Sequence, residues 1–344
     1  MKIAIIKLSA MGDIIHSMVA LEFLKKSFPN SKIDWIVEKS FAEVLQNNPN
    51  INNILSLNLK SIKKDKSKIF SQIKLIKKYS KNNYNFVIDA QGLLKSAIVS
   101  KLISNKNSKI IGFNKSSIRE GIASWFYNKK INISYDSNTI DRNIKVICEA
   151  FNIDPTSKDI IDKDRFLFFK SGFNKINLKE DYNIFVIGST WESRNYPKEK
   201  FVEIANILKI KTYISWGSKE EYQKALWMQE QSEYLESLPK VNLNELKEII
   251  YHSKLLIGND TGPTHMAWGL NIPSITIFGP TPINRIYITP INKAIKSNSQ
   301  INHYKLNKND FSIKDIEVKE ILNQVQNDNS KIVITLLILQ LYCH

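Results

Sequence analysis

The sequence predicts an α/β protein of two doubly wound, Rossmann-like domains, and three observations lead to this fold class. The chain of 344 residues exceeds what one hydrophobic core usually organises. Short apolar runs bounded by Gly, Asp or Asn alternate with helical segments, and these runs form two series. The runs are continuously apolar, which is typical of parallel strands that helices cover on both faces.

Each series supplies four expected strands. The first consists of KIAIIKL (2–8), IDWIV (33–37), NFVIDA (85–90) and KIIGF (109–113). The second consists of IFVIG (184–188), TYISW (212–216), KLLIG (254–258) and SITIFG (274–279). In such folds the ligand lies in the crevice outside the carboxyl ends of the strands. We therefore expect a site there, between two domains that face a central cleft.

The domain boundaries follow from the two series. We expect an N-terminal domain at 1–155, an inter-domain linker at 156–181, a C-terminal domain at 182–311, a helix at 312–328 and an atypical apolar tail at 329–344. The final helix shows helical spacing after a Ser cap, and it would close the second domain or pack back on the first.

The charge balance indicates an anionic partner. Lysine and arginine outnumber aspartate and glutamate by 49 to 33, which gives a formal net charge of +16. Such a field attracts nucleic acid, an anionic membrane surface or a phosphorylated substrate. No nucleic-acid motif accompanies the charge, so we expect no nucleic-acid partner. The basic segment 59–83 is either a solvated helix or a surface that touches an anionic membrane. Its apolar side consists of Ile62, Ile69, Phe70, Ile73 and Ile76.

Cysteine usage and apolar runs bear on the compartment. Cys148 and Cys343 lie far apart and outside any Cys/His cluster, so neither a disulfide framework nor a zinc site is indicated. Lys7 and Asp13 interrupt the first apolar stretch, which favours a strand over a secretory signal. The run at 332–342 is about half the length that spans a bilayer. A reducing compartment is the expectation.

The first candidate site is KLSAMGDIIHS (7–17), where a strand ends in a turn at Gly12 and a helix follows. The turn lacks the G-x-G-x-x-G spacing, which disfavours NAD or FAD. Asp13 is either a general base that takes a proton from an attacking hydroxyl or a helix N-cap. DAQGLLKS (89–96) repeats the strand-to-helix pattern, so Asp89, Gln91 and Lys95 are expected to line the same crevice.

The second series carries two more candidates. In GSTWESRNYP (188–197), Ser189, Thr190 and Arg194 suit a nucleotide diphosphate, although a polar loop before a Pro-started helix would look the same. In LLIGNDTGPTHMAWGL (255–270), a helix begins after a buried strand, and its first amides make an anion site. That site would include Asp260, Thr261 and Gly262, and His265 is either a diphosphate-facing or a satisfied, half-buried imidazole. FGPTP (278–282) would line the same pocket.

One motif is better explained without a ligand. Asp162-Lys163-Asp164 matches the D-x-D pattern with which many glycosyltransferases hold a divalent metal. It falls in the polar segment between the two series rather than at a strand end. We therefore interpret it as a solvated turn.

Taken together and in order, these motifs resemble glycosyltransferase family 9, the heptosyltransferases of lipopolysaccharide core assembly. The resemblance covers residues 1 to about 325 and is carried by the KxSxMGDxxH start, DWxVE (34–38), DAQGLxKS, REGIASWFYNKK (119–130) and DTGPTH. It implies a GT-B fold, with the acceptor on the N-terminal domain and the donor on the C-terminal one. It also implies inverting transfer, with no metal and no cofactor.

The resemblance assigns residues by matching position. Asp13 would be the general base, and Glu221, or Glu220 beside it, would bind the ribose of the donor. Ser189, Thr190 and Arg194 would hold the diphosphate, where the family commonly has Lys in place of Arg194. Asp260, Thr261, Gly262 and His265 would contact the heptose and diphosphate of the donor. Acceptor contacts would come from Ser9, Met11, Gly12, Gln91, Lys95, Arg119 and Arg142.

The implied donor is ADP-L-glycero-β-D-manno-heptose and the implied acceptor is Kdo-lipid A, handled by a monomer on the cytoplasmic face of the inner membrane. The nearest alternative is a later heptosyltransferase of the same family that adds the second or a branch heptose. More distant alternatives are a non-enzymatic polyanion-binding protein and a nicotinamide-dependent oxidoreductase.

Overall fold

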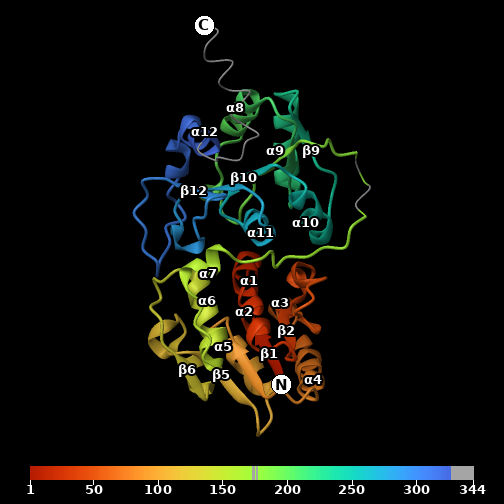
Figure 1. Cartoon of the computed structure of the whole chain (residues 1–344), viewed down its shortest axis with the longest axis vertical. Coiled ribbons are helices and arrows are strands. Elements are labelled where there is room, and N and C mark those ends of the chain that lie inside the picture. The colour runs from red at the N-terminus through yellow and green to blue at the C-terminus, as the bar shows by residue number, and fades with distance from the viewer. Residues whose placement is uncertain (173–174, 176, 327–344) are drawn as a thin grey trace. The chain divides into compact units, whose positions relative to one another are not determined.

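The computed structural model describes residues 1–172, 175 and 177–326, and within them the chain forms two parallel six-stranded sheets. The first sheet has the order β3-β2-β1-β4-β5-β6 and the second the order β9-β8-β7-β10-β11-β12. Counted from its own first strand, each sheet therefore has the Rossmann order 3-2-1-4-5-6. The predicted fold class, two doubly wound α/β domains, is confirmed (Figure 1).

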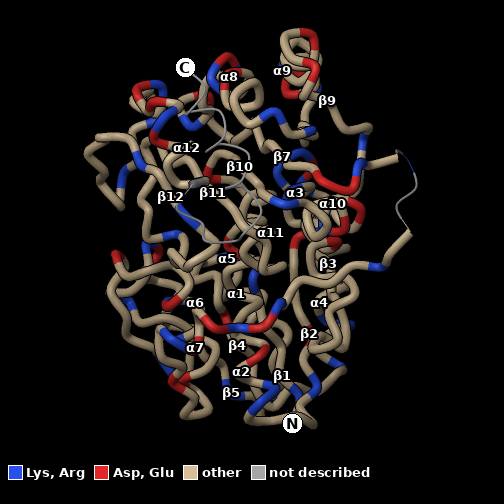
Figure 2. Tube along the Cα trace, turned by 45° about the horizontal axis from the view of Figure 1, so that its top comes forward, with Lys and Arg blue, Asp and Glu red and all other residues tan. Residues whose placement is uncertain are grey.

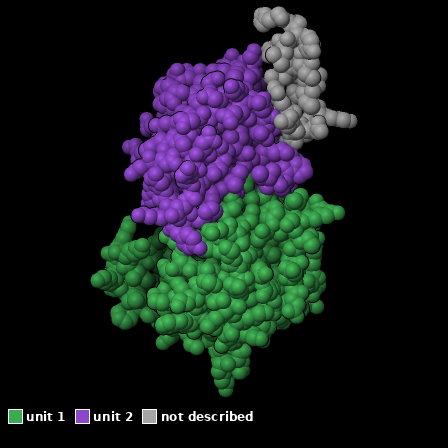
Figure 3. All heavy atoms as spheres, turned by 90° about the vertical axis from the view of Figure 1, so that its left-hand side faces the viewer, with its two compact units in different colours: residues 1–172, 242–248, 284–287 green, residues 173–241, 249–283, 288–344 purple. Residues whose placement is uncertain are grey.

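The chain divides into two compact units. Unit 1 comprises Met1–Gly172, Asn242–Glu248 and Asn284–Tyr287, and unit 2 comprises Phe173–Val241, Ile249–Ile283 and Ile288–His344 (Figure 3). Unit 1 continues past the expected domain end at 155 and takes in most of the expected linker, including the helix α7 (Ser157–Ile161). The expected tail at 329–344, the last two residues of the expected helix at 312–328, and Cys343 lie outside the described residues.

Unit 1 is built on six strands whose inner members are almost fully buried. The strands are β1 (Lys2–Ile6), β2 (Lys32–Glu38), β3 (Asn53–Leu57), β4 (Phe86–Asp89), β5 (Lys109–Phe113) and β6 (Lys129–Ile131). The helices are α1 (Met11–Met18), α2 (Ala20–Ser27), α3 (Lys60–Lys64), α4 (Lys68–Ser80), α5 (Leu94–Ile103), α6 (Thr139–Cys148) and α7. Short 3₁₀ segments are η1 (Lys39–Leu45), η2 (Lys115–Ser117), η3 (Gly121–Phe126) and η4 (Glu149–Phe151).

Unit 2 repeats the plan. Its strands are β7 (Asn183–Val186), β8 (Thr212–Ser215), β9 (Leu235–Ser237), β10 (Leu255–Asn259), β11 (Ser274–Phe278) and β12 (Asn292–Lys296). The helices that follow β7 in the chain are α8 (Lys198–Leu208), α9 (Lys219–Glu230), α10 (Leu243–Tyr251), α11 (Gly262–Leu270) and α12 (Val318–Gln326), of which α10 is grouped with unit 1 up to Glu248. The 3₁₀ segments are η5 (Glu192–Arg194), η6 (Ile283–Arg285) and η7 (Ser312–Asp315).

The C-terminal helix closes unit 2. Ile313, Ile316 and Ile321 are buried in the same apolar cluster as Phe201 of α8. The helix starts later than the Ser cap suggested, because Ser312 opens the 3₁₀ turn η7 and α12 begins at Val318. At the break, the Glu317 backbone N–H donates to the Glu320 carboxylate at 2.8 Å. Of the two packing alternatives for this helix, the one on the second domain is confirmed.

The doubly wound order fixes where a ligand can bind. In each sheet the chain reverses direction of winding between its first and fourth strands, and the loops after those strands diverge at a topological switch point. In unit 1 these are the loops after β1 and β4, and in unit 2 the loops after β7 and β10. Each of these four loops contains residues that the sequence singled out. Lysines and arginines occur in both units, so the positive charge is not confined to one of them (Figure 2).

Candidate functional site

Asp13 lies in the first turn of α1, directly beyond the carboxyl end of β1. Its Oδ2 accepts a hydrogen bond from the Ala10 backbone N–H at 3.1 Å, so the carboxylate reaches back across the helix start. Ala10, rather than Asp13, occupies the N-cap position. Asp13 is half-buried and lies at the switch point of the sheet. The carboxylate therefore supports the helix start, as hydrogen-bonded side chains of a first turn do, and lies where the sequence predicts a base.

Gln91 ties the two switch-point loops of unit 1 together. Its Oε1 accepts hydrogen bonds from the backbone N–H groups of Leu8 at 2.9 Å and Ser9 at 3.0 Å. The loop after β4 thus fixes the loop that leads into α1 and Asp13. Ser9, Met11, Gly12 and Gln91 are all half-buried in this small region.

Asp89 does not line the crevice, and this expectation from the sequence is wrong. The residue is fully buried, and its carboxylate accepts hydrogen bonds from the backbone N–H groups of Gln91 and Gly92 and from the hydroxyls of Ser96 and Tyr127, at 2.7 to 3.1 Å. Burial raises the pKa of Asp89, while the hydrogen bonds oppose the rise. Asp89 therefore shapes the turn that carries Gln91 rather than touching a ligand.

Lys7 lies at the end of β1 beside these loops, and the sequence reasoning assigned it no role. It is only 6% exposed, and its Nζ donates to the Ala90 carbonyl at 2.8 Å and to Asn143 Oδ1 at 2.9 Å. Burial lowers the pKa of Lys7, and the charges of Asp13 and Asp89 oppose this effect. A lysine at the end of an otherwise apolar strand was the available signal, since such a group is rarely buried without a polar partner.

The basic residues expected to bind an acceptor differ in their solvent exposure and in their hydrogen bonds. Lys95 and Arg119 are exposed, Lys95 in the first turn of α5 and Arg119 beside η3. Arg142 is half-buried on α6 and donates to the Ser117 and Ser134 carbonyls at 2.7 and 2.6 Å. Its guanidinium also lies 5.1 Å from the Phe113 ring centroid. Arg142 thus holds two loops together besides carrying charge.

In unit 2, the loop after β7 places Ser189, Thr190 and Arg194 beyond the carboxyl end of that strand. Ser189 is half-buried, and its hydroxyl donates to the Trp191 carbonyl at 2.9 Å, while Thr190 is exposed. Arg194 closes the 3₁₀ turn η5 and is about nine-tenths buried.

Asp260 organises the loop after β10. It is 2% exposed, and its Oδ2 accepts from Arg194 at 2.7 Å and from the Thr281 hydroxyl at 2.8 Å. Arg194 also donates to the Asp260 carbonyl. His265 Nε2 lies 3.0 Å from Oδ1 of the same carboxylate. His265 is thus a buried imidazole bonded to Asp260, and Thr281, in the FGPTP turn, joins the cluster without having been assigned a role.

The first turn of α11 is where the sequence predicts an anion site. Thr261 is its N-cap, Gly262 and Pro263 begin the helix, and all three are half-buried. The proline falls where a missing N–H costs nothing. The remaining first-turn N–H groups and the positive end of the helix dipole lie beside Arg194 and Asp260.

Glu221 packs against the end of β7. It is the third residue of α9, where its carboxylate accepts from the Gly217 N–H at 2.6 Å and its own N–H donates to Ser218 Oγ at 3.2 Å. A Cβ built on Gly188 would overlap this carboxylate. Glu220 next to it is exposed, and hydrogen bonding lowers its pKa. Of the two, Glu221 is the one at the switch-point edge of the sheet.

The D-x-D motif lies within unit 1, directly after α7 and not after a strand. Asp162 and Asp164 are exposed, whereas Lys163 between them is 6% exposed, and burial lowers its pKa to about 8. Within the described residues, no group of three His, Cys, Asp or Glu side chains is placed to hold a metal ion. In the same part of the chain, no helix has the length and apolarity needed to cross a membrane.

Comparison with known proteins places these sites in a family. The profile of glycosyltransferase family 9 (heptosyltransferase) matches residues 72–317. The chain is 40% identical to lipopolysaccharide heptosyltransferase 1 of Campylobacter coli, covering 95% of this chain and 98% of that protein. It is 29% identical to lipopolysaccharide heptosyltransferase 1 of Escherichia coli K12, covering 82% and 88%.

Solved structures share the fold. The E. coli heptosyltransferase WaaC with ADP superposes with a TM-score of 0.79 at 22% identity, covering 95% of this chain and 100% of that one. E. coli ADP-heptose LPS heptosyltransferase II gives 0.71 at 17% identity, covering 95% and 98%. The two-sheet architecture is therefore the GT-B architecture of these enzymes. The chain belongs to glycosyltransferase family 9 and is a glycosyltransferase of the heptosyltransferase kind.

Proposed function

We propose that this protein transfers L-glycero-D-manno-heptose from ADP-heptose to the Kdo residue of Kdo-lipid A in the lipopolysaccharide inner core. The observation that carries the proposal is the 40% identity, over nearly the whole chain, to a lipopolysaccharide heptosyltransferase 1. The basic residues Lys95 and Arg119 on unit 1 suit an acceptor that bears carboxylate and phosphate groups.

In the proposed reaction, the acceptor hydroxyl attacks the anomeric carbon as the bond to ADP breaks, which inverts the configuration. Asp13 takes the proton of the hydroxyl. Its hydrogen bond to the Ala10 N–H supports this role, because it fixes the direction of the carboxylate. Burial lowers the pKa of Lys7, and the negative charge of Asp13 opposes this effect, so the two residues are electrostatically coupled.

The leaving ADP needs donors for its diphosphate charge. Arg194, Ser189, Thr190 and the amides at Thr261 and Gly262 would supply them, and we propose that no metal is required. Asp260 and His265 would act largely by fixing Arg194 and the helix start, since Asp260 already bonds Arg194 and Thr281. Glu221 would accept hydrogen bonds from the ribose hydroxyls of the donor.

The enzyme would work as a monomer on the cytoplasmic face of the inner membrane, where the acceptor lipid is displayed. The basic, partly apolar surface of α3 and α4 supports such peripheral contact with an anionic surface.

The test is a transfer assay with purified protein, ADP-heptose and a heptose-free inner-core lipid, in the presence of EDTA. We expect the lipid to gain the mass of one heptose with EDTA present, and to gain nothing with Asp13→Ala. Transfer only to a lipid that already carries heptose would instead assign a later step of core assembly. Loss of transfer in EDTA, restored by a divalent cation, would contradict the metal-free reaction.

A further inference from the structure

An apolar groove of about 640 Å³ runs along unit 1 between α4 and α5. Ile76 and Val99 form its buried floor, and both are at most 3% exposed. Ile69 and Ile98 stand on its walls and remain 42% and 43% exposed. The groove is lined by Leu59, Ile62, Lys63, Lys66, Ile69, Gln72, Ile73, Ile76, Lys95, Ile98, Val99 and Leu102. Apolar side chains this exposed along one continuous hollow mark a binding surface rather than a core.

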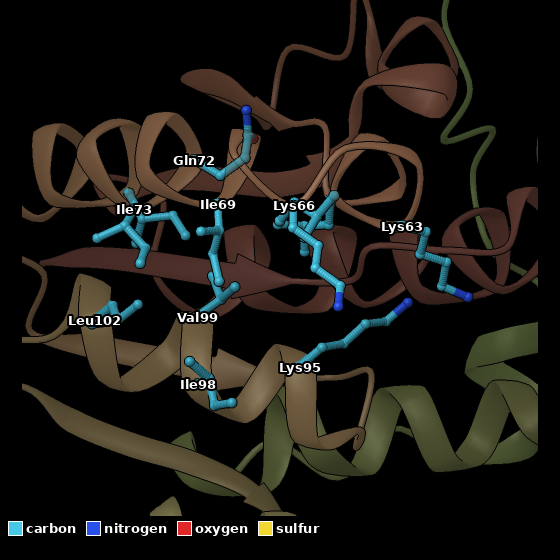
Figure 4. Close-up of a pocket in the computed structure, with 12 residues that line it drawn as sticks. Lys63, Lys66, Ile69, Gln72, Ile73, Lys95, Ile98, Val99 and Leu102 are labelled. Atoms are coloured by element: carbon cyan, nitrogen blue, oxygen red, sulfur yellow. The ribbon is translucent and has the colours of Figure 1, made fainter.

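The two ends of the groove differ in chemistry. Figure 4 shows Lys63, Lys66 and Lys95 at one end, with the Lys66 and Lys95 ammonium groups directed toward one another, and Ile73 and Leu102 at the other. None of these lysines forms an ion pair with another described residue. A ligand that complements the groove is therefore amphiphilic, with an anionic group at one end of an apolar chain.

The basic end is the end closest to the proposed base. Lys95 lies in the first turn of α5, which begins beyond the carboxyl end of β4. At that edge, Gln91 bonds the loop that leads into α1 and Asp13. The apolar part follows α5 away from this edge toward Leu102, over a helix about 15 Å long. A ligand with its head at Lys95 would direct its chain away from the site of transfer.

From this arrangement we propose that the groove binds one acyl chain of the phosphorylated lipid acceptor, while Lys63, Lys66 and Lys95 hold an anionic group of its head. The proposal rests on the proposed function, because it assumes that a lipid acceptor binds near Asp13, at the carboxyl ends of the unit 1 strands. It adds that the enzyme recognises the chain and not only the sugar.

Binding of dodecyl phosphate below its micelle concentration tests the groove without any transfer. We expect one saturable site in calorimetry, with an affinity at least about a hundredfold above that of inorganic phosphate. Ile98→Glu should weaken it by about tenfold or more, because a charge enters the apolar wall. Ile69→Trp should weaken it too, because the larger ring fills the hollow. Ile207→Glu, on α8 and similarly exposed at 39%, should leave it unchanged.

Two results of these binding measurements would overturn the proposal. One is equal affinity for dodecyl phosphate and inorganic phosphate. The other is a pair of results for Ile69→Trp: it binds phosphatidylglycerol vesicles more tightly than the wild type does, and it binds dodecyl phosphate equally well. That pattern would describe a face that lies on a membrane rather than a groove that takes a single chain.

Kinetics separate this inference from the proposed function. With acylated and fully deacylated acceptors, the wild type should show a KM at least about tenfold lower for the acylated one, and Ile98→Glu should bring the ratio toward one with kcat retained. Equal KM values in the wild type would refute the groove while leaving transfer intact. Absence of transfer to both acceptors would refute the proposed function, and the dodecyl phosphate measurements would still decide the groove.

Discussion

Replacing Asp260 by Asn tests whether one buried carboxylate organises the loop after β10 in unit 2. Asp260 is 2% exposed and lies within 2.7 to 3.0 Å of polar atoms of Arg194, Thr281 and His265. Asn has the same shape, so the change removes the charge and one acceptor oxygen without opening a cavity. The Arg194 side chain, 11% exposed, would keep its charge and lose its counter-charge.

The expected loss of unfolding free energy is about 3 kcal/mol. Removing one partner of a buried ion pair costs roughly 3–5 kcal/mol. The lower end applies here, because Arg194 retains some contact with solvent and the Asn carbonyl still accepts one hydrogen bond. For a unit of this size, about 3 kcal/mol corresponds to a fall in Tm of roughly 6–12 °C.

Thermal unfolding followed by calorimetry measures the effect, and Asp181→Asn is the matched control. Asp181 pairs with Lys254 at 2.9 Å in the same unit, but the two side chains are 74% and 44% exposed. An exposed pair contributes about 0.5 kcal/mol or less, so this control should shift Tm by no more than about 2 °C. If Asp260→Asn unfolds within a degree of Asp181→Asn, the carboxylate does not organise the cluster.

The other predictions concern unit 1. Asp13→Asn should lower turnover by about 10² to 10⁴ while ADP affinity in calorimetry stays constant; full turnover would leave Asp13 only its helix-start role. Lys7→Met should lower the free energy of urea unfolding by about 2 kcal/mol, since the Ala90 carbonyl and Asn143 lose a buried donor, and an unchanged midpoint would contradict this. Burial lowers the pKa of Lys163 from 10.5 to about 8, so between these pH values the unfolded state binds more protons than the folded state. The free energy of unfolding of the wild type should therefore rise across this pH window by at most about 3 kcal/mol relative to that of Lys163→Met. If the free energies of unfolding of the two proteins change in parallel from pH 7.5 to 10.5, Lys163 does not contribute to this pH dependence.

The sequence revealed the inner strands of both sheets and missed the outer ones, for a physical reason. Each of the eight expected strands is present, and the strands not expected are β3, β6, β9 and β12. These are the edge strands of the described sheets. An edge strand has one neighbour and is only partly covered, so it needs no continuous apolar run. NILSL of β3 and LES of β9 carry no such signal.

The loops of the site were predictable, but the roles of some side chains within them were not. Strand ends at a switch point can be located from hydrophobic runs alone, and this placed Asp13, Gln91 and Asp260. Whether a polar residue at a strand end faces a ligand or the interior depends on partners distant in sequence. Asp89 is turned inward because Tyr127, 38 residues away, supplies a buried hydroxyl at 2.7 Å. No local pattern contains that information.

The close approach of Glu221 to Gly188 makes two positions interdependent. Any side chain at 188 would have to displace the Glu221 carboxylate, which is the far end of a flexible side chain. Under the proposed contact between Glu221 and the ribose, a substitution at Gly188 would act on the donor indirectly, by moving that carboxylate. A library designed to alter the donor would therefore vary the two positions together.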